Sequence, residues 1–228
     1  MHGIKKGNIK EVIGTIVKSM GSTLAACGDV NRNVMAPAAP YEKGSYPAAR
    51  KLANDIADVL SPQKAEKTYI DLWVDGEMKY AIKPSSEAKK NRKLQRNPGV
   101  FSGDKNEPLY GATYLPRKFK TTVIIPPHND VDMHANDMNF VAMSDETGKK
   151  LIGFNVVVGG GLSFAHGMKT TFPTTAHDFG YIPAEKLLDC AEAIVSLQRD
   201  WGNRVDRTNA KTRYTIARVG LETFKAEV

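Results

Sequence analysis

Apolar and polar residues follow two different periods along this chain, and these periods predict where helices and strands lie. Apolar residues at helical spacing predict four helices, over residues 8–21, 46–60, from Pro183 onward, and 213–227. Asn8 is the expected cap of the first helix, with Glu11 as its partner and Gly21 as its end.

Shorter apolar and β-branched runs predict strands at 69–74, 78–82, 120–125, 139–143 and 151–158. Asp75-Gly76-Glu77 and the turn 144–148 predict a hairpin each, whereas the Gly-, Asn- and Pro-rich stretch 22–40 predicts a loop that lies close to a ligand. Helices combined with hairpins indicate an α+β fold, with a mixed, largely antiparallel sheet and flanking helices.

Length and composition are typical of a globular protein. The chain has 228 residues, 41% hydrophobic and 25% charged, which is enough for one large domain or two small ones. No apolar stretch approaches the roughly 20 residues that span a bilayer, and the first residues contain no secretory signal. Two distant cysteines, Cys27 and Cys190, suit a reducing compartment, so we expect a cytoplasmic protein without a membrane partner.

The net charge of +7 is concentrated in one segment. Between Lys83 and Glu107 there are seven basic and three acidic residues, with Pro, Gly and Ser among them, so residues 83–110 are expected to be a flexible basic loop. A nucleic-acid binder that acts through this loop is an alternative function. With one aromatic residue, Phe101, the loop lacks a stacking pattern, which favours a solvated insertion and no nucleic-acid partner.

Four basic side chains carry the strongest chemical signal: Arg32, Arg117, Lys118 and Lys120. On a strand, Lys118 and Lys120 project from one face, roughly 6.6 Å apart along the backbone. At such a short distance the two ammonium groups repel each other unless an anion lies between them. The guanidinium of Arg32 could then complete a clamp for a small oxyanion. Spacing alone leaves open a solvated basic strand end.

The context of these residues resembles a known family, the assimilatory sulfite reductase hemoproteins of the siroheme-containing sulfite and nitrite reductase superfamily. The resemblance covers nearly all of the chain apart from the basic loop. The segments that carry it are Thr23–Val34, Tyr114–Thr121, His134–Phe140, Gly153–Asn155, Gly159–Gly161, Gln198–Arg204 and Asp206–Tyr214.

The resemblance implies a sulfur-assimilation enzyme of cysteine biosynthesis that reduces sulfite to sulfide by six electrons. Siroheme carries eight carboxylates, so its pocket needs many basic donors. In the family an Arg and two Lys surround sulfite, and the matching positions are Arg32, Lys118 and Lys120. The expected cofactor-binding residues are His2, Asn31, Arg117, Arg207, Asn209 and Lys211.

The chain also departs from the family. A 4Fe–4S cluster coupled to siroheme needs four cysteines, and this chain has two without a C-x-x-C spacing. We therefore expect residues 1–228 to be the central siroheme-binding domain of a longer chain. The expected partners are sulfite, an electron donor (NADPH-dependent flavoprotein or ferredoxin) and the missing cluster-bearing half. The long basic loop is similar to plant-like forms, for which a plastid location is the alternative.

Other functions compete with this interpretation. A siroheme nitrite reductase is the nearest alternative enzyme, although the two lysines favour sulfite. A non-catalytic fragment or anion-binding module is another alternative.

Three local motifs indicate other chemistry only weakly. The alternating His and Asp residues of 128–134 could bind a metal on a strand, but Pro126-Pro127 favours a loop and we assign no metal ligand. Gly159-Gly160-Gly161 lacks the spacing of a dinucleotide-binding loop, which favours close backbone packing. Ser163 and His166 lack the glycines of a hydrolase nucleophile elbow.

Overall fold

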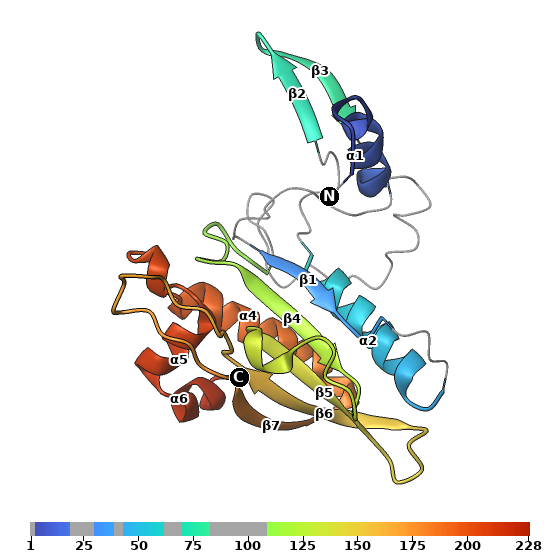
Figure 1. The fold of residues 1–228 in the computed structure, drawn as a ribbon, viewed down its shortest axis with the longest axis vertical. Coiled ribbons are helices and arrows are strands. Elements are labelled where there is room, and N and C mark those ends of the chain that lie inside the picture. Colours follow the sequence, from blue (N-terminus) through green and yellow to red (C-terminus); the bar gives the residue numbers. More distant parts are fainter. Residues whose placement is uncertain (1–2, 19–29, 39–42, 62–69, 83–108) are drawn as a thin grey trace.

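The computed structural model describes residues 3–18, 30–38, 43–61, 70–82 and 109–228. Their centre is a five-stranded sheet in the order β1-β4-β5-β6-β7 (Figure 1). The strands are β1 (Asn31–Met35), β4 (Phe119–Ile124), β5 (Met138–Ser144), β6 (Leu151–Val158) and β7 (His177–Pro183). The basic loop lies almost wholly outside the described residues.

The sheet is mixed, as predicted. The β1–β4 and β4–β5 pairs are parallel, whereas β5–β6 and β6–β7 are antiparallel. The strands β2 (Ile70–Val74) and β3 (Glu77–Ile82) form the predicted antiparallel hairpin. Three of the five pairings are therefore antiparallel, and the α+β class is confirmed.

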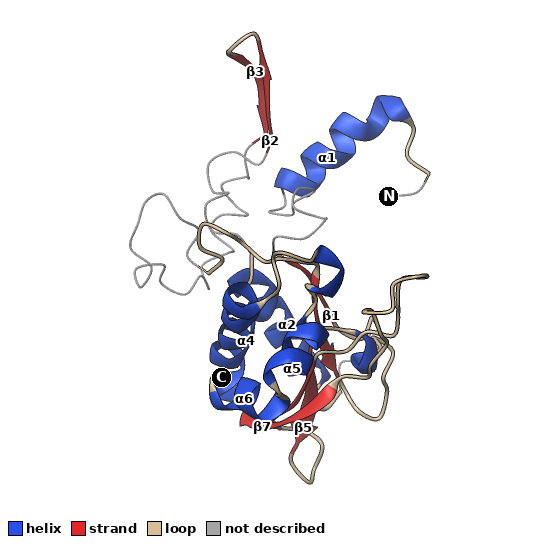
Figure 2. Cartoon of the chain, turned by 90° about the vertical axis from the view of Figure 1, so that its left-hand side faces the viewer, coloured by secondary structure: helices blue, strands red, loops and turns tan. Residues whose placement is uncertain are grey.

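One face of the sheet forms the hydrophobic core. Cross-strand partners such as Val123, Phe140 and Val156 point to the same face because paired residues share a side of the sheet. The helices α2 (Tyr46–Val59) and α4 (Leu187–Trp201) pack against each other and lie together on one side of the sheet (Figure 2). Their buried residues Ile56, Leu187 and Ile194 complete the core.

The remaining elements follow the predicted pattern with local differences. The helix α1 (Ile9–Lys18) lies within the predicted range 8–21. It is beside β3 and away from the larger sheet (Figure 1). It is preceded by the 3-10 turn η1 (Lys6–Asn8), so Asn8 lies within a turn that starts after Lys5, and the predicted Asn8 cap is wrong. The predicted end of this helix, Gly21, is outside the described residues. Within the described ranges, every helix is too short or too polar to cross a membrane.

Four further features differ from the prediction in detail. The predicted loop 22–40 contains the edge strand β1, and no strand was predicted at β7. Pro183 ends β7 instead of opening a helix, and the 3-10 turn η5 (Ala184–Lys186) then leads into α4. The single C-terminal helix is two, α5 (Thr212–Val219) and α6 (Leu221–Ala226), because Gly220 adopts a φ of 91° that ends α5.

The core assignment predicts how two phenylalanines respond to the same change. Phe140 is fully buried, so Phe140→Ala should lower the free energy of unfolding by about 3–5 kcal/mol in urea titrations. The control is Phe164→Ala, whose side chain is 65% exposed and whose loss should change stability by less than about 0.5 kcal/mol. Equal effects of the two substitutions would contradict this core.

Candidate functional site

The parallel pairing of β1 with β4 brings the predicted oxyanion clamp together. Asn31 on β1 is the Cα partner of Phe119 on β4, and Lys118 and Lys120 flank Phe119. Arg32 directly follows Asn31, in the irregular stretch of the register between Asn31 and Val34, and its side chain is exposed. Because neighbouring strands lie about 4.8 Å apart, the three basic residues start from adjacent backbone.

Asn31 fixes this pairing from within. It is 8% exposed, and its backbone N–H donates to Tyr110 Oη at 3.0 Å. Its Oδ1 accepts a hydrogen bond of 2.8 Å from Thr121 Oγ1 on β4. Asn31 thus orients the two strands, and its predicted contact with a cofactor stays a prediction.

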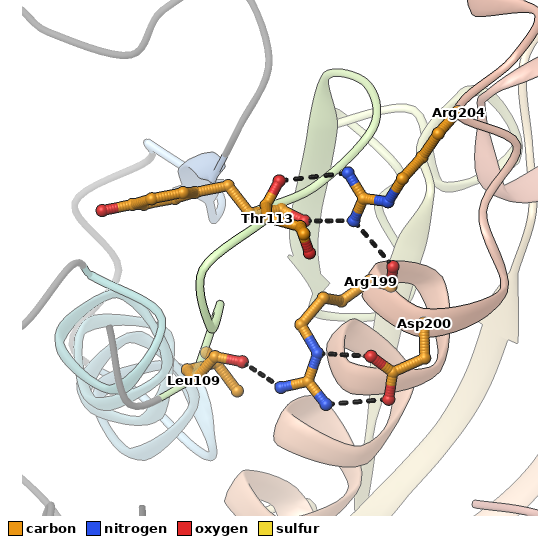
Figure 3. Close-up of polar contacts among 6 residues, drawn as sticks. Leu109, Thr113, Arg199, Asp200 and Arg204 are labelled. Atoms are coloured by element: carbon orange, nitrogen blue, oxygen red, sulfur yellow. Dashed lines mark hydrogen bonds and ion pairs between the residues drawn. The ribbon is translucent and has the colours of Figure 1, made fainter. Parts of the chain in front are cut away.

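Arg199 in the last turn of α4 and Arg204 just after this helix anchor the segment that leads into β4 (Figure 3). Arg199 Nη1 donates to the carbonyl of Leu109 at 2.5 Å, while two hydrogen bonds join its guanidinium to Asp200. Arg204 donates to the carbonyls of Thr113 and Tyr114 at 3.0 and 2.5 Å. These contacts fix residues 109–114, so the backbone on which Arg117 and Lys118 follow is held in place.

A fifth cation, Lys211, joins the site from the turn before α5. Burial lowers its pKa, and the positive charges of Arg213, Arg117 and Lys120 lower it further, whereas the Asp137 carboxylate raises it. Lys211 therefore lies within electrostatic reach of both Arg117 and Lys120. We call Arg32, Arg117, Lys118, Lys120 and Lys211 the basic cluster.

One acidic residue, Asp137, lies at the base of this basic cluster. It is 6% exposed, and its Oδ2 accepts a 3.1 Å hydrogen bond from the backbone N–H of Lys120. Burial raises the pKa of Asp137 to about 6, although the nearby charge of Lys211, the Lys120 hydrogen bond and the Thr212 side chain act in the opposite direction. The site therefore combines clustered cations with a carboxyl group that titrates near neutral pH.

The three glycines pack as closely as predicted. The Gly159 and Gly160 N–H groups donate to the carbonyls of Asp137 and Asn136 at 2.8 and 3.0 Å. A Cβ on Gly160 would lie 2.3 Å from the His134 carbonyl oxygen, and one on Gly161 would lie 2.1 Å from Arg213 Nη1. Only glycine fits here, so these residues hold the backbone of Asp137 rather than form a phosphate loop.

Arg213 secures the other side of the glycines. Its guanidinium is buried and donates to the carbonyl of Gly161, to the Ser163 carbonyl at 2.6 Å and to Tyr214 Oη at 2.8 Å. These contacts assign Arg213 a structural role.

Two other predicted cofactor residues, Arg207 and Asn209, lie together on one turn. The Asn209 amide donates to Asp206 Oδ2 at 2.7 Å and Thr170 Oγ1 at 3.2 Å, so it stabilises the turn η6 (Arg207–Asn209). Asn209 also lines a cavity of about 290 Å³ with Thr170 and Phe172. Arg207 is exposed on the same turn, and His2 is outside the described residues. Their contacts with a cofactor stay predictions.

The cysteines do not fit an iron–sulfur cluster held by this chain alone. Cys190 is buried in α4, and burial raises the pKa of its thiol to about 12, so it is not a thiolate. Cys27 is outside the described residues, and two cysteines supply at most half of four thiolates. No group of three or more His, Cys, Asp or Glu in the described ranges could hold a metal ion. The segment 128–134 is a loop that leads into the 3-10 turn η4 (Met133–Ala135).

The chain combines a mixed α+β fold with a cluster of cations at strands β1 and β4, and comparisons with known proteins place it in a family. The model described as "Nitrite and sulphite reductase 4Fe-4S domain" matches residues 92–228. Because this is more than half of the chain, the chain belongs to the nitrite and sulphite reductase family, which binds siroheme and 4Fe–4S clusters.

Curated relatives agree with this placement. The chain is 50% identical over 227 residues to the sulfite reductase [NADPH] hemoprotein beta-component of Yersinia pestis, and 49% identical to that of Tolumonas auensis. It is covered completely in both alignments, yet it spans only 35% and 36% of these relatives. Among solved structures, Mycobacterium tuberculosis NirA matches with a TM-score of 0.52 at 22% identity, over 87% of this chain and 26% of NirA. This match shows the fold.

Several residues of the site were not singled out from the sequence. Asp137, Arg199, Arg204 and Arg213 were quoted only within stretches that resemble the family, without a role. For Asp137 the sequence offers only an acidic residue directly before an apolar strand, and its nearest charged neighbours along the chain, Asp132 and Asp145, are acidic as well. The arginines give no such signal, because their partners are backbone carbonyls up to 91 residues away.

The burial of Asp137 predicts a pH-dependent effect on stability. Its pKa is raised in the folded state, so its contribution is fully present below the unfolded value of 3.8 and is lost as the pH rises through about 6. Relative to the parent, Asp137→Asn should therefore gain up to about 3 kcal/mol in free energy of unfolding between pH 4 and pH 7, measured by urea titration.

Asp145→Asn is the control with the opposite sign. The backbone N–H of Lys150 and the Thr147 hydroxyl lower the pKa of this exposed carboxylate, so its stabilisation is present above the unfolded value and lost as the pH falls. Asp145→Asn should therefore lose stability relative to the parent as the pH rises. A pH-independent difference between Asp137→Asn and the parent would contradict the burial of an ionisable carboxyl group.

Proposed function

We propose that this chain is the siroheme-binding part of an assimilatory sulfite reductase that reduces sulfite to sulfide. The observation that supports this most is the parallel β1–β4 pairing, which brings Arg32 next to Lys118 and Lys120. Relatives named sulfite reductase hemoprotein at 50% identity over the whole chain support the same reaction. The paired lysines favour sulfite over nitrite.

The residues present fit a polyacidic macrocycle. Arg117 and Lys211 are half-buried and within electrostatic reach of each other, so they repel unless an anion lies between them. Carboxylates of siroheme would neutralise these charges through charge-assisted hydrogen bonds. Arg207, Asn209 and His2 are the further proposed contacts. Siroheme, when bound, supplies the iron that takes the sulfur ligand and passes electrons to it.

The chain's own residues bind and protonate the substrate. Arg32 donates its planar N–H groups to two oxygens of sulfite and so orients the anion. Lys118 and Lys120 donate hydrogen bonds from Nζ to the oxygens on which charge develops, and each supplies a proton as an S–O bond breaks. Asn31, Arg199 and Arg204 keep this geometry fixed, because their contacts hold the strands that carry the three cations.

Electrons must come from outside the chain. Its two cysteines cannot complete a 4Fe–4S cluster, so we propose that a cluster-bearing polypeptide completes the site and that a flavoprotein or ferredoxin reduces it. The relatives' printed name includes NADPH, which favours a flavoprotein. A cytoplasmic location fits these partners.

The visible absorption spectrum of the complete native protein tests the proposal. Siroheme predicts a Soret band together with bands in the red region. A protein without these bands that still binds sulfite would be an anion-binding module, and siroheme binding would be ruled out.

The proposed clamp predicts how substitutions divide between turnover and cofactor content. Lys118→Ala or Arg32→Ala in the complete protein should lower the rate of sulfite reduction by about 100-fold or more, because a donor to the developing charge is lost. The siroheme content per chain, read from the same absorbance bands, should fall by much less.

Lys149→Ala is the matched control, because Lys149 is exposed at the β5–β6 turn and lies outside the basic cluster. It should leave both quantities unchanged. An equal loss of turnover and siroheme in Lys118→Ala would assign Lys118 to cofactor binding instead.

A further inference from the structure

The buried position of Asp137 lowers the stability of the folded protein at neutral pH. It is almost completely buried, and the Lys120 N–H and the Thr212 side chain do not offset its loss of solvation, since the pKa of its carboxyl group is still raised to about 6. Burial of a carboxylate without full hydrogen bonding is unfavourable, and an amide of the same shape would carry no charge to desolvate. A residue that lowers stability at neutral pH and faces cations invites a functional explanation.

We propose that Asp137 is a positioning residue that sets the charge of the basic cluster: its carboxylate keeps Lys211 protonated, and its protonation strengthens anion binding. This proposal rests on the anion-binding role given above to the basic cluster, but it does not depend on siroheme.

The contacts of Asp137 fix its charge in space. Oδ2 accepts the Lys120 N–H at 3.1 Å and the main-chain carbonyl accepts the Gly159 N–H at 2.8 Å, so neither end of the residue is free to turn away. The Lys120 backbone is thus in direct contact with the carboxylate, while its side chain belongs to the anion site. A change of charge on Asp137 acts on this site over a short, partly buried distance.

The direction of the effect on Lys211 follows from its neighbours. Burial, Arg213, Arg117 and Lys120 all lower the pKa of Lys211, and Asp137 is the group that raises it. Loss of the carboxylate would lower this pKa further, so Lys211 would lose its proton, and the site a positive charge, at a lower alkaline pH.

The direction in which pH changes anion affinity follows from the charge of the site alone. With a pKa of about 6, Asp137 is ionised at pH 7 and mostly neutral at pH 5. The net positive charge of the site therefore rises by one as the pH falls, and anions bind more tightly at the lower pH. A bound anion in turn raises the pKa of Asp137 by linkage.

The charged groups that face Asp137 are Lys120 on β4 and Lys211 before α5, with Arg117 and Arg213 next to Lys211. Two histidines lie nearby and need controls. His134 lies three residues before Asp137, and His177 Cδ2 lies 3.7 Å from the position of a Cβ on Gly159.

Sulfate binding to the complete native protein, measured by calorimetry from pH 5 to pH 9, tests the proposal. Sulfate keeps its double charge over this range, so any step comes from the protein. The parent should bind sulfate about fivefold more tightly at pH 5 than at pH 7. Asp137→Asn should show no step between pH 5 and pH 7, and its alkaline loss of affinity should begin at a lower pH than in the parent.

His134→Gln and His177→Gln are the controls, and both should keep the acid step. A step that persists in Asp137→Asn, or that disappears in either histidine variant, would overturn the assignment to Asp137.

A second measurement needs no substitution, in case Asp137→Asn does not fold. The amide resonance of Lys120 reports the ionisation of its acceptor and should titrate with a midpoint near pH 6, which moves upward when sulfate is added. A resonance that does not titrate, or a midpoint that sulfate leaves unchanged, would overturn the proposal. The visible spectrum of the same sample keeps the two proposals apart: siroheme bands with pH-independent sulfate binding refute only the role of Asp137, whereas a pH-dependent site without bands refutes only siroheme binding.

Discussion

The parallel pairing of β1 with β4 is the contact on which the site depends. Asn31 and Phe119 are directly opposed in this ladder, and the hydrogen bond between Asn31 and Thr121 fixes the register from the side chains. A slip of one residue would turn Arg32 to the other face and bury a guanidinium in the core. Residues almost 90 positions apart in the sequence thus form one cationic surface.

Such a surface is unfavourable unless it is anchored and compensated. The anchors are backbone carbonyls: Arg199 and Arg204 hold the segment before β4, and Arg213 holds the glycines behind Asp137. The compensating charge is the carboxylate of Asp137, which is close to Lys120 and Lys211. Burial raises the pKa of this carboxyl group to about 6. On the proposal above, stability and ligand affinity both respond to pH through the same buried group.

Local patterns in the sequence were sufficient for elements with a clear period. The helix α2, the β2–β3 hairpin and the β5–β6 hairpin lie where apolar spacing and turn residues predicted them. The strands β1 and β7 were not predicted, because Asn-Arg-Asn-Val-Met and His-Asp-Phe-Gly-Tyr-Ile-Pro are not apolar enough for a strand pattern. Pairing with partners far along the chain stabilises them. The resemblance to the family identified the lysine pair and Arg32, but the counter-charge at Asp137 could not be predicted, because its effect comes from burial and from Lys211, 74 positions further along the chain.

The central claim is that Arg32 and Lys118 act on one anion in a single site. A double-mutant cycle for sulfite binding, with Arg32→Ala, Lys118→Ala and the combined variant in the complete protein, tests it most directly. Two residues that share a ligand should show a coupling free energy of about 1–3 kcal/mol, so the double variant should lose clearly less affinity than the sum of the single variants. Losses that add to within about 0.3 kcal/mol would show that the two residues act independently, and the shared site would be refuted.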